Sequence, residues 1–310
     1  MTRHLTSLTI DLFEQFMELL ATKWNAFLIY SKAAYLIYRI GLRLTRGKTY
    51  RDQYFLDNRI SLGDFLLFER PLKINGIKAI PRKHTTDFNM LFHEKESKVE
   101  SRLDLNNGET FLDIGANVGR YTLKAATQYS DIKIVSIEAH PKNYEALCRN
   151  ISCNGFSNII TINKAVSDRK GKITLYEHIT ENNRLLTDDF SIDAAAGQYA
   201  KKKSSIEVET DSIDNILKEI KIERPNVLKM DIEGAEVMAL KGAKNTLNKL
   251  RKIIVEIHLN NLQQVREILL ANNFDIEVID IPQMTWHYYY IVGTKHFQNG
   301  NTRLKESITA

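Results

Sequence analysis

The most constraining feature of this sequence is the stretch Phe111–Gly119, FLDIGANVG, in which an apolar run ends in an acid and a turn with two glycines. The run Phe111–Ile114 predicts a short buried strand, and the residues after Gly119 predict a helix. A strand that leads through a glycine turn into a helix is typical of open parallel sheets, which hold ligands at the carboxyl ends of their strands. Glycines there can adopt backbone angles closed to other residues, and the helix presents free N–H groups. The stretch therefore predicts an α/β domain with a ligand at this turn.

The spacing of the turn indicates which ligand it suits. A dinucleotide fingerprint, G-x-G-x-x-G, places five residue steps between its outer glycines and binds a pyrophosphate. Here the span from Gly115 to Gly119 is one step shorter, Asn117 replaces the middle glycine, and Asp113 precedes the turn. A carboxylate would repel a pyrophosphate but suits a ligand that carries an ammonium group. The turn favours S-adenosylmethionine over NAD, and an ordinary glycine turn of an α/β domain remains the alternative.

Composition bounds the class of protein. The 310 residues, with 43% hydrophobic and 26% charged residues, are ordinary for a soluble globular protein and allow one sizeable core with a smaller appended region. A net charge of +5 does not by itself argue for nucleic acid. The two cysteines, Cys148 and Cys153, provide neither a disulfide framework nor a Cys/His zinc spacing, so we expect a cytoplasmic location.

The N-terminal region differs from the rest of the chain. Residues 5–46 carry Leu, Phe, Tyr and Ile at helical spacing, but Lys23 and Lys32 interrupt the apolar face too often for a membrane span. A basic cluster follows, from Arg39 to Arg51. The helices are predicted either to form a cap whose cationic end is solvated or to contact an anionic membrane surface or an acidic substrate.

A β-hairpin and a turn lead into the main domain. Asn75-Gly76 between two short apolar segments predicts a two-residue hairpin, and Asn106-Asn107-Gly108 predicts the turn before the central strand. We therefore divide the chain into an N-terminal helical region with a β-hairpin, residues 1–100, and a ligand-binding domain, residues 101–310.

Strands and helices alternate after the glycine turn, which is the signature of a parallel sheet with crossover helices. Further strands are predicted at residues 132–138, 159–163, 227–231, 253–258, 274–279 and 288–292. An additional strand pair, 172–178 and 206–210, flanks a long polar link, 182–203. A link of that length inside a compact domain predicts a lid over the substrate or a disordered loop.

Acids at the predicted strand ends are candidate site residues. Glu138 ends the second strand, where a carboxylate can accept both hydrogen bonds of a ribose diol. The loop 165–168 would lie where an adenine edge can be read. Asp231, Glu233 and Glu236 surround the turn after the fourth strand, where acids can bind a metal, act as a base or stabilise a helix N-terminus.

Two histidines also lie near predicted strand ends. His258 ends the fifth strand and titrates near neutrality, so it is either a general base or a strand cap held by backbone hydrogen bonds. His140 is expected to be a turn residue beside the adenosine. The acids lack the pairing with Asn or Asp that metal-dependent catechol-type O-methyltransferases show, so no metal is predicted.

Taken together, the motifs resemble the FkbM family of S-adenosylmethionine-dependent methyltransferases. The resemblance runs in order from about Asn107 to His258 and is carried by DIGANVGRYTLKAA, SIEAHPKNYEALCRNISCNG, NKAVSD, GKITLYEH, VETDSID, LKMDIEGAEVMALKGA and IIVEIH. It implies a class I methyltransferase fold: a Rossmann-like α/β domain with a seven-stranded, mostly parallel sheet, helices on both faces and an antiparallel last strand. It also implies O-methylation of sugars, polyketides or other natural products.

The resemblance assigns roles to matching positions. The methionine end of the cofactor would be lined by Asp113, Gly115, Ala116, Asn117 and Gly119. Glu138 would hold the ribose, the region Asn163–Ser167, with Asn163 and Ala165, would meet the adenine, and Asp231 would face the reaction centre. Methyl transfer to a hydroxyl needs alignment and a base, for which His258 and Asp231 are the candidates.

The favoured function is therefore O-methylation of a small-molecule or glycan acceptor, with possible peripheral membrane contact through the N-terminal helices. The alternatives are a non-catalytic S-adenosylmethionine-binding module and a methyltransferase that acts on a macromolecule. Nucleic acid is disfavoured as a partner, because the turn at Asp231 reads D-I-E-G where amino-methyltransferases carry an Asn/Asp-Pro-Pro-aromatic turn.

Overall fold

A computed structural model describes residues 71–74, 76–83, 85–92, 97–179, 185–191, 202–258, 261–280 and 289–295. The predicted N-terminal helices and the basic cluster lie outside the described residues, as do residues 192–201 of the predicted lid. The predictions for those segments, including membrane contact, stay predictions.

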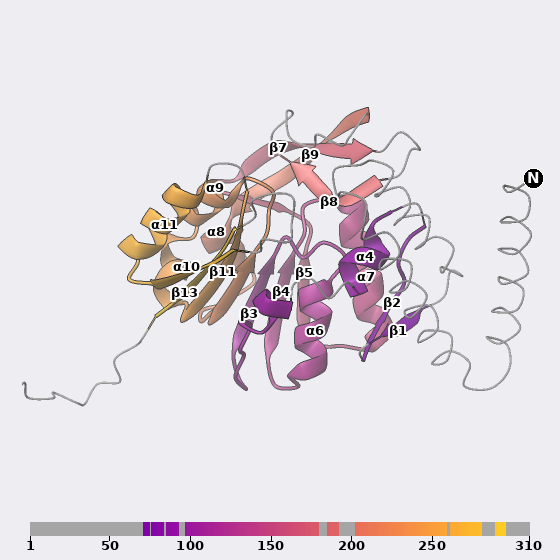
Figure 1. Ribbon diagram of the computed structural model, residues 1–310, viewed down its shortest axis with the longest axis horizontal. Helices are drawn as coiled ribbons and strands as arrows, with labels where there is room; N and C mark the ends of the chain where they lie inside the picture. Colours follow the sequence, from indigo (N-terminus) through magenta and orange to yellow (C-terminus); the bar gives the residue numbers. More distant parts are fainter. Residues whose placement is uncertain are drawn as a thin grey trace, which may run out of the picture.

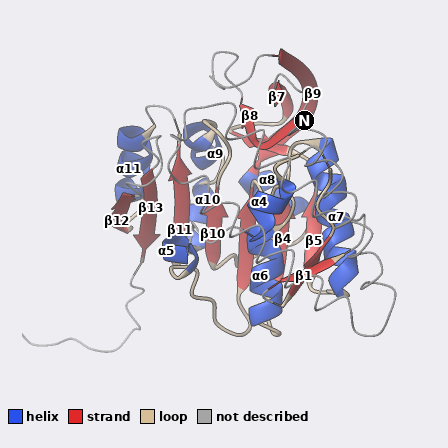
Figure 2. Ribbon diagram, turned by 45° about the vertical axis from the view of Figure 1, so that its right-hand side comes forward, coloured by secondary structure: helices blue, strands red, loops and turns tan. Residues whose placement is uncertain are grey.

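The centre of the fold is a seven-stranded sheet with the order β12-β13-β11-β10-β3-β4-β5. Its strands are β3 (Thr110–Ile114), β4 (Lys133–Ile137), β5 (Ile159–Ile162), β10 (Val227–Met230), β11 (Lys252–Ile257), β12 (Asp275–Asp280) and β13 (Tyr289–Thr294). All neighbouring strands are parallel except for the two pairs that β13 makes with β11 and β12 (Figure 2). The predicted mostly parallel sheet with an antiparallel last strand is confirmed.

Apolar side chains cover both faces of this sheet. On one face, Leu112 and Leu228 belong to a cluster with buried residues of the helices α8 (Ile213–Glu219), α9 (Glu236–Lys241), α10 (Lys244–Lys249) and α11 (Leu262–Ala271). On the other, Phe111 and Ile134 pack with residues of α5 (Ser97–Glu100) and α6 (Arg120–Gln128). A sheet buried on both faces requires the near-continuous apolar runs seen in the sequence, because successive side chains point to opposite sides.

The predicted hairpin is confirmed as β1 (Leu72–Ile74) and β2 (Ile77–Ala79), which pair antiparallel around Gly76 at φ 85°. It lies beside α7 (Pro141–Asn154), as Figure 1 shows. The Asn150 side chain accepts a hydrogen bond from the backbone N–H of Ile80 at 2.8 Å. The short helix α4 (Asp87–Phe92) follows the hairpin. The hairpin thus contacts the ligand-binding domain, and the division at residue 100 stays a prediction.

A second, four-stranded sheet lies above the carboxyl ends of the parallel strands (Figures 1 and 2). It has the order β6-β9-β7-β8 and consists of β6 (Ala165–Ser167), β7 (Gly171–Ile179), β8 (Leu185–Ser191) and β9 (Lys202–Ser212). The predicted strand pair corresponds to β7 and β9, which are antiparallel.

Two predictions in this region were wrong in part. Residues 165–167, expected in a loop, form β6 on β9, and residues 185–191 of the predicted lid form β8 on β7. The reason is that both strands are stabilised by backbone pairing, β6 with the distant β9 and β8 with β7, the strand just before it, and a local polar pattern does not reveal this pairing. Closure over a substrate stays a prediction.

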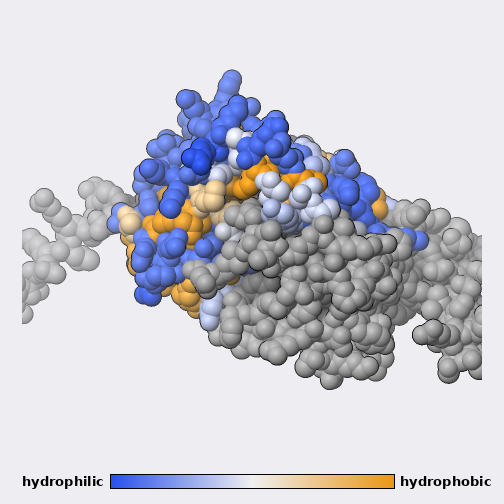
Figure 3. All heavy atoms as spheres, turned by 90° about the horizontal axis from the view of Figure 1, so that it is seen from above, coloured by the Kyte–Doolittle hydropathy of each residue, from blue (hydrophilic) through white to orange (hydrophobic). Residues whose placement is uncertain are grey.

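The described surface gives no sign of a membrane span. Among the described helices, none is both long and apolar enough to cross a bilayer. Seen from above, the described residues are largely hydrophilic, with hydrophobic residues gathered in patches between them (Figure 3). The expected cytoplasmic location stays a prediction.

Candidate active site

The glycine turn joins β3 to α6 and contacts the end of β10. Gly115 has φ 77°, and a Cβ atom there would lie 1.8 Å from the backbone oxygen of Asp231. Gly119 has φ 102°, and its Cβ would lie 2.9 Å from Leu147 Cδ1. The turn is anchored to β4, because the N–H groups of Gly115 and Ala116 both donate to the Ile137 carbonyl. Glycine is therefore needed at positions 115 and 119 at least partly because the turn packs closely against other parts of the chain. At Gly115 this packing holds the ends of β3 and β10 together.

Asp113 is fully buried beneath this turn. Its Oδ2 accepts a hydrogen bond of 2.6 Å from Thr122 Oγ1, whereas Oδ1 is buried with no hydrogen-bond donor among the described residues. Burial raises the pKa of Asp113 and outweighs the opposing effects of the Lys229 charge and the Thr122 hydrogen bond. An acceptor oxygen without a donor at this edge fits a ligand that carries an ammonium group.

Glu138 follows β4 and is 6% exposed. Its Oε2 accepts from the backbone N–H of Asn117 at 2.8 Å, and its Oε1 accepts from that of His140 at 2.9 Å. Burial raises its pKa to about 7, although both backbone hydrogen bonds lower it. Each carboxylate oxygen has a further lone pair, so an ionised Glu138 fits the two hydroxyl groups of a ribose.

The predicted adenine region is tied to the neighbouring strand end. The Asn163 side chain donates to the carbonyl oxygens of Glu138 and Ala139 at 2.8 and 3.1 Å. Ala165 is buried at the start of β6. Whether these two residues meet an adenine stays a prediction.

His140 has a packing role beyond the one expected for a turn residue. It precedes α7, it is 1% exposed, and its Nε2 lies 2.9 Å from Glu177 Oε1 on β7. Burial lowers its pKa, although Glu177 raises it. His140 is therefore a neutral, buried contact between the main domain and the second sheet.

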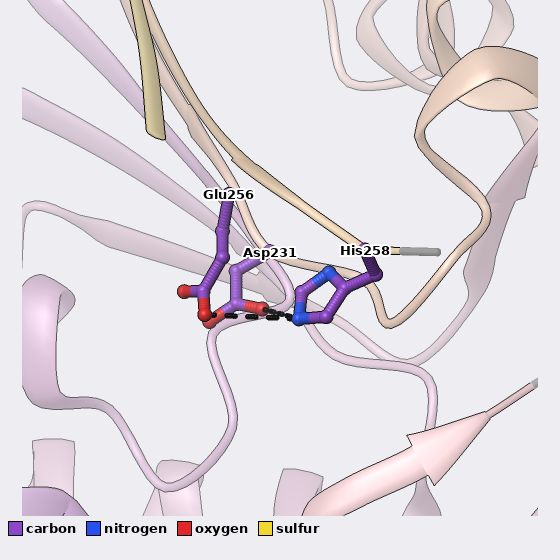
Figure 4. A group of neighbouring side chains, drawn as sticks. All are labelled: Asp231, Glu256 and His258. Atoms are coloured by element: carbon purple, nitrogen blue, oxygen red, sulfur yellow. Dashed lines mark ion pairs between the residues drawn. The ribbon is translucent and has the colours of Figure 1, made fainter. Parts of the chain in front are cut away.

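Acidic side chains and one imidazole converge where β10 and β11 end, and we call Asp231, Glu233, Glu236, Glu256 and His258 the acid–imidazole cluster. Figure 4 shows three of them, Asp231, Glu256 and His258. The Nε2 atom of His258 lies 3.3 Å from Glu233 Oε2, 3.7 Å from Glu256 Oε1 and 3.9 Å from Asp231 Oδ1. Its Nδ1 lies 2.8 Å from Glu236 Oε1.

These carboxylates change the protonation of His258, which is 6% exposed. Burial alone would lower its pKa, but the surrounding carboxylates raise it well above the usual value. An imidazole that already carries its proton must lose it before it can act as a base. The role of His258 as the general base stays a prediction.

Asp231 has the opposite charge state and more contact with solvent. Its side chain is 25% exposed, and its Oδ2 accepts from Lys229 Nζ at 3.2 Å. Burial raises its pKa, but the charges of Lys229 and His258 outweigh burial and lower it. Asp231 is therefore ionised at neutral pH.

Residues that the sequence did not single out orient the cluster. Tyr290 donates its hydroxyl to Glu256 Oε2 at 2.5 Å. Lys229 is 3% exposed, and its ammonium group also lies 4.6 Å from the centre of the Tyr121 ring. In the sequence, Lys229 stands two residues before Asp231 and Glu256 two residues before His258, each in an otherwise apolar strand. Residues two apart in a strand point to the same side, so this spacing was the available signal that both charged residues face the cluster.

Glu236 belongs to the first turn of α9 and is fully buried. It accepts hydrogen bonds from the Gly234 N–H at 2.9 Å and from the Asn261 side chain at 2.6 Å, besides its contact with His258. The sequence allowed three roles for the acids after β10: metal ligand, base and stabiliser of a helix start. The hydrogen bonds of Glu236 correspond to the third role, because they hold the turn and the start of α9.

The sheet order and the carboxylates at the strand ends define the class of protein, a class I methyltransferase fold. Residues 113–276, just over half of the chain, match the family described as Methyltransferase FkbM domain. The chain belongs to the FkbM methyltransferase family, as the motifs predicted, and its cofactor is S-adenosylmethionine.

Several known proteins are similar to this chain. The hexuronic acid methyltransferase AglP of Haloferax volcanii is 26% identical over 146 residues, which are 47% of this chain and 54% of that protein. The methyltransferase sdnD of Sordaria araneosa is 25% identical over 197 residues, 56% of this chain and 76% of the relative. The chain thus spans about half the length of the archaeal relative.

Solved structures show a weaker likeness. The methyltransferase domain of METTL16 has 12% sequence identity and a TM-score of 0.47, with 80% of this chain and 82% of that chain covered. The family match over residues 113–276 and the sheet order carry the assignment.

Proposed function

We propose that this protein transfers the methyl group of S-adenosylmethionine to a hydroxyl of a sugar, a glycan or another small natural product. The observation that carries the proposal is the acid–imidazole cluster, which lies beside the glycine turn through the contact between Gly115 and the end of β10. The printed name of the archaeal relative, a hexuronic acid methyltransferase, supports an acidic sugar as the first acceptor to test.

The cofactor would lie along the carboxyl ends of β3, β4 and β5. The residues proposed to hold it are Asp113, Gly115, Ala116, Asn117 and Gly119 at the methionine end, Glu138 at the ribose, Asn163 and Ala165 at the adenine, and Asp231 toward the methyl group. When bound, S-adenosylmethionine supplies a methyl group on a sulfonium, and the electron pair of the broken S–C bond stays on sulfur.

The acceptor hydroxyl would bind at Asp231. Its carboxylate is ionised and is 25% exposed, whereas His258 is 6% exposed, so Asp231 is the more accessible of the two candidate catalytic residues. A hydrogen bond from the hydroxyl to this carboxylate would orient the oxygen for in-line attack and receive the proton as the O–C bond forms.

The same cluster distinguishes an enzyme from a binding module. A module that only binds S-adenosylmethionine needs the cradle around Asp113 and Glu138 but gains nothing from acids gathered around an imidazole. Charges at buried positions are costly, so their presence at the ligand edge favours catalysis.

The test uses the full chain and S-adenosylmethionine with a labelled methyl group. We expect calorimetry to show cofactor binding, and label to enter a hexuronic acid glycoside or a neutral glycoside. Label that enters only RNA or protein would favour the macromolecular alternative, and absence of cofactor binding would refute the proposal. Glu277 is exposed and paired with Arg102. A Glu277→Gln variant therefore serves as the control, and it should bind the cofactor and transfer the methyl group as the wild type does.

A further inference from the structure

The three polar atoms that face one another in Figure 4 come from two adjacent parallel strands. We propose that Asp231 Oδ1, Glu256 Oε1 and His258 Nε2 bind one divalent transition-metal ion. Each residue offers one ligand atom, and these atoms lie within 4.8 Å of one another. The proposed site combines two carboxylates with an imidazole, all at the carboxyl edge of the sheet.

The separations of the three proposed ligand atoms fit a shared ion. His258 Nε2 lies 3.7 Å from Glu256 Oε1 and 3.9 Å from Asp231 Oδ1, beyond the range of about 2.7–3.2 Å for a hydrogen bond, and its nearest acid is Glu233 Oε2 at 3.3 Å. Ligands bound at about 2.1 Å to one ion stand about 3 to 4 Å from each other. The two separations therefore fit ligands that surround a common centre.

The second observation is that each proposed ligand is oriented through its other polar atom. His258 Nδ1 contacts Glu236 at 2.8 Å, and since an ionised carboxylate only accepts, Nδ1 is the donor. Nε2 then faces the cluster, and a bound ion would replace the second proton that the carboxylates hold on the imidazole. This carboxylate–histidine arrangement is the one that metal-binding histidines adopt almost always.

The two carboxylates are held in the same manner. Glu256 Oε2 accepts from the Tyr290 hydroxyl at 2.5 Å, while Oε1 is the atom nearer to His258 Nε2. Asp231 Oδ2 accepts from Lys229 Nζ at 3.2 Å, while Oδ1 is the atom nearer to the imidazole. In a simple group of surface acids, the carboxylate oxygen that faces away from the cluster would not have a hydrogen-bond donor in every case.

Charge points to a cation as well. Four carboxylates surround one imidazole, and Glu256 is only 8% exposed. Two of the four carboxylates, Glu236 and Glu256, are buried, and such a concentration of negative charge is costly unless cations accompany it. A divalent ion would bind the inner oxygens and reduce the repulsion between them.

The ligand types narrow the choice of metal. An imidazole nitrogen favours first-row transition ions such as Mn²⁺, Fe²⁺ or Zn²⁺ over Ca²⁺, which prefers an all-oxygen site. The prediction of no metal depended on the absence of acids with the catechol-type spacing, and it did not consider Glu256, two residues before His258 on β11. A further part of the inference rests on the proposed function: a bound divalent ion would lower the pKa of the acceptor hydroxyl, so that its activation beside Asp231 needs no neutral imidazole as a base.

The test measures Mn²⁺ binding to the metal-free full chain, through the loss of the electron paramagnetic resonance signal of free Mn²⁺. We expect one Mn²⁺ per chain, at least tenfold weaker binding in Asp231→Asn and Glu256→Gln, and unchanged binding in Glu277→Gln. Tyr290→Phe removes only the hydroxyl that orients Glu256, and we expect it to weaken binding about tenfold. Thermal melts of each variant show whether it is folded.

Two results would overturn the inference: a wild-type protein that leaves millimolar Mn²⁺ free, or folded Asp231→Asn and Tyr290→Phe variants that bind Mn²⁺ as the wild type does. The failure of the proposed function is distinguishable from both. Mn²⁺ binding without methyl transfer to any acceptor would contradict the proposed function alone, and full methyl transfer by chelator-treated protein without metal would contradict only the role of the metal in activating the hydroxyl.

Discussion

The carboxyl edge of the sheet holds two groups of buried and half-buried acids that are satisfied in different ways. At the ends of β3 and β4, Asp113 and Glu138 accept hydrogen bonds from a neutral hydroxyl and from backbone N–H groups. At the ends of β10 and β11, Asp231 and Glu256 lie near an imidazole and near each other. The first group is held by neutral donors, namely a hydroxyl and backbone N–H groups, and the second lies among charged side chains.

This difference indicates what each half of the site can do. A carboxylate held by main-chain donors keeps its geometry with or without a ligand, which suits recognition of a neutral diol such as a ribose. Acids gathered around an imidazole need a compensating cation or a proton, which suits chemistry at a hydroxyl. Binding of the cofactor and activation of the acceptor should therefore be separable by mutation.

The largest expected effect is at Gly115, where the two halves meet. Its φ of 77° and the 1.8 Å approach of a Cβ to the Asp231 oxygen should make Gly115→Ala lose about 4 kcal/mol of unfolding free energy, because the backbone has to move. Urea denaturation measures it. Gly108→Ala is the matched control, since its φ is 79° but no atom lies within 4 Å of the added Cβ, and it should cost only about 1–2 kcal/mol. Equal losses of unfolding free energy in the two variants would mean that the close approach at Gly115 does not affect stability.

The next effect separates chemistry from binding. His258→Ala removes the centre of the acid–imidazole cluster and should lower kcat by about 10²–10³ while the Kd for S-adenosylmethionine changes less than threefold. Single-turnover kinetics and calorimetry on one preparation measure both quantities. A loss of cofactor affinity as large as the loss of rate would show that the two halves are not independent.

Glu138→Ala should produce the reverse pattern. Removal of the proposed ribose acceptor should weaken cofactor binding by about 10- to 100-fold, which corresponds to about 1.5–3 kcal/mol for hydrogen bonds to a charged group. Binding of Mn²⁺ at the acid–imidazole cluster should not change. Calorimetry with the cofactor and resonance measurements with the metal test the two statements, and unaltered cofactor affinity would remove Glu138 from the binding site.

The smallest effect is a pH dependence of cofactor binding. The pKa of Glu138 is raised to about 7, so its carboxylate is ionised above that pH and protonated below it. If the ionised form holds the diol, affinity should be about tenfold weaker at pH 6 than at pH 8. Calorimetry at the two pH values measures it, and Glu138→Gln should flatten the profile. An affinity that rises toward low pH would contradict the assignment.

The sequence by itself determined much of the fold. Apolar runs such as Phe111–Ile114 specify strands that are buried on both faces, and Asn75-Gly76 specifies a hairpin, because the period of side chains and the needs of tight turns act over a few residues. The placement of Glu138 and Asp231 at strand ends followed from the same local patterns. The family resemblance covered the order of the motifs.

Only the tertiary structure decided which side chains meet. Tyr290 stands opposite Glu256 because β13 inserts beside β11, and β6 forms because the distant β9 pairs with it. The contact of Gly115 with the end of β10 joins residues more than a hundred positions apart. Such contacts depend on strand order and register, which the packing of the whole chain selects, so the orientation of Asp231, Glu256 and His258 around one point could not be predicted from local pattern.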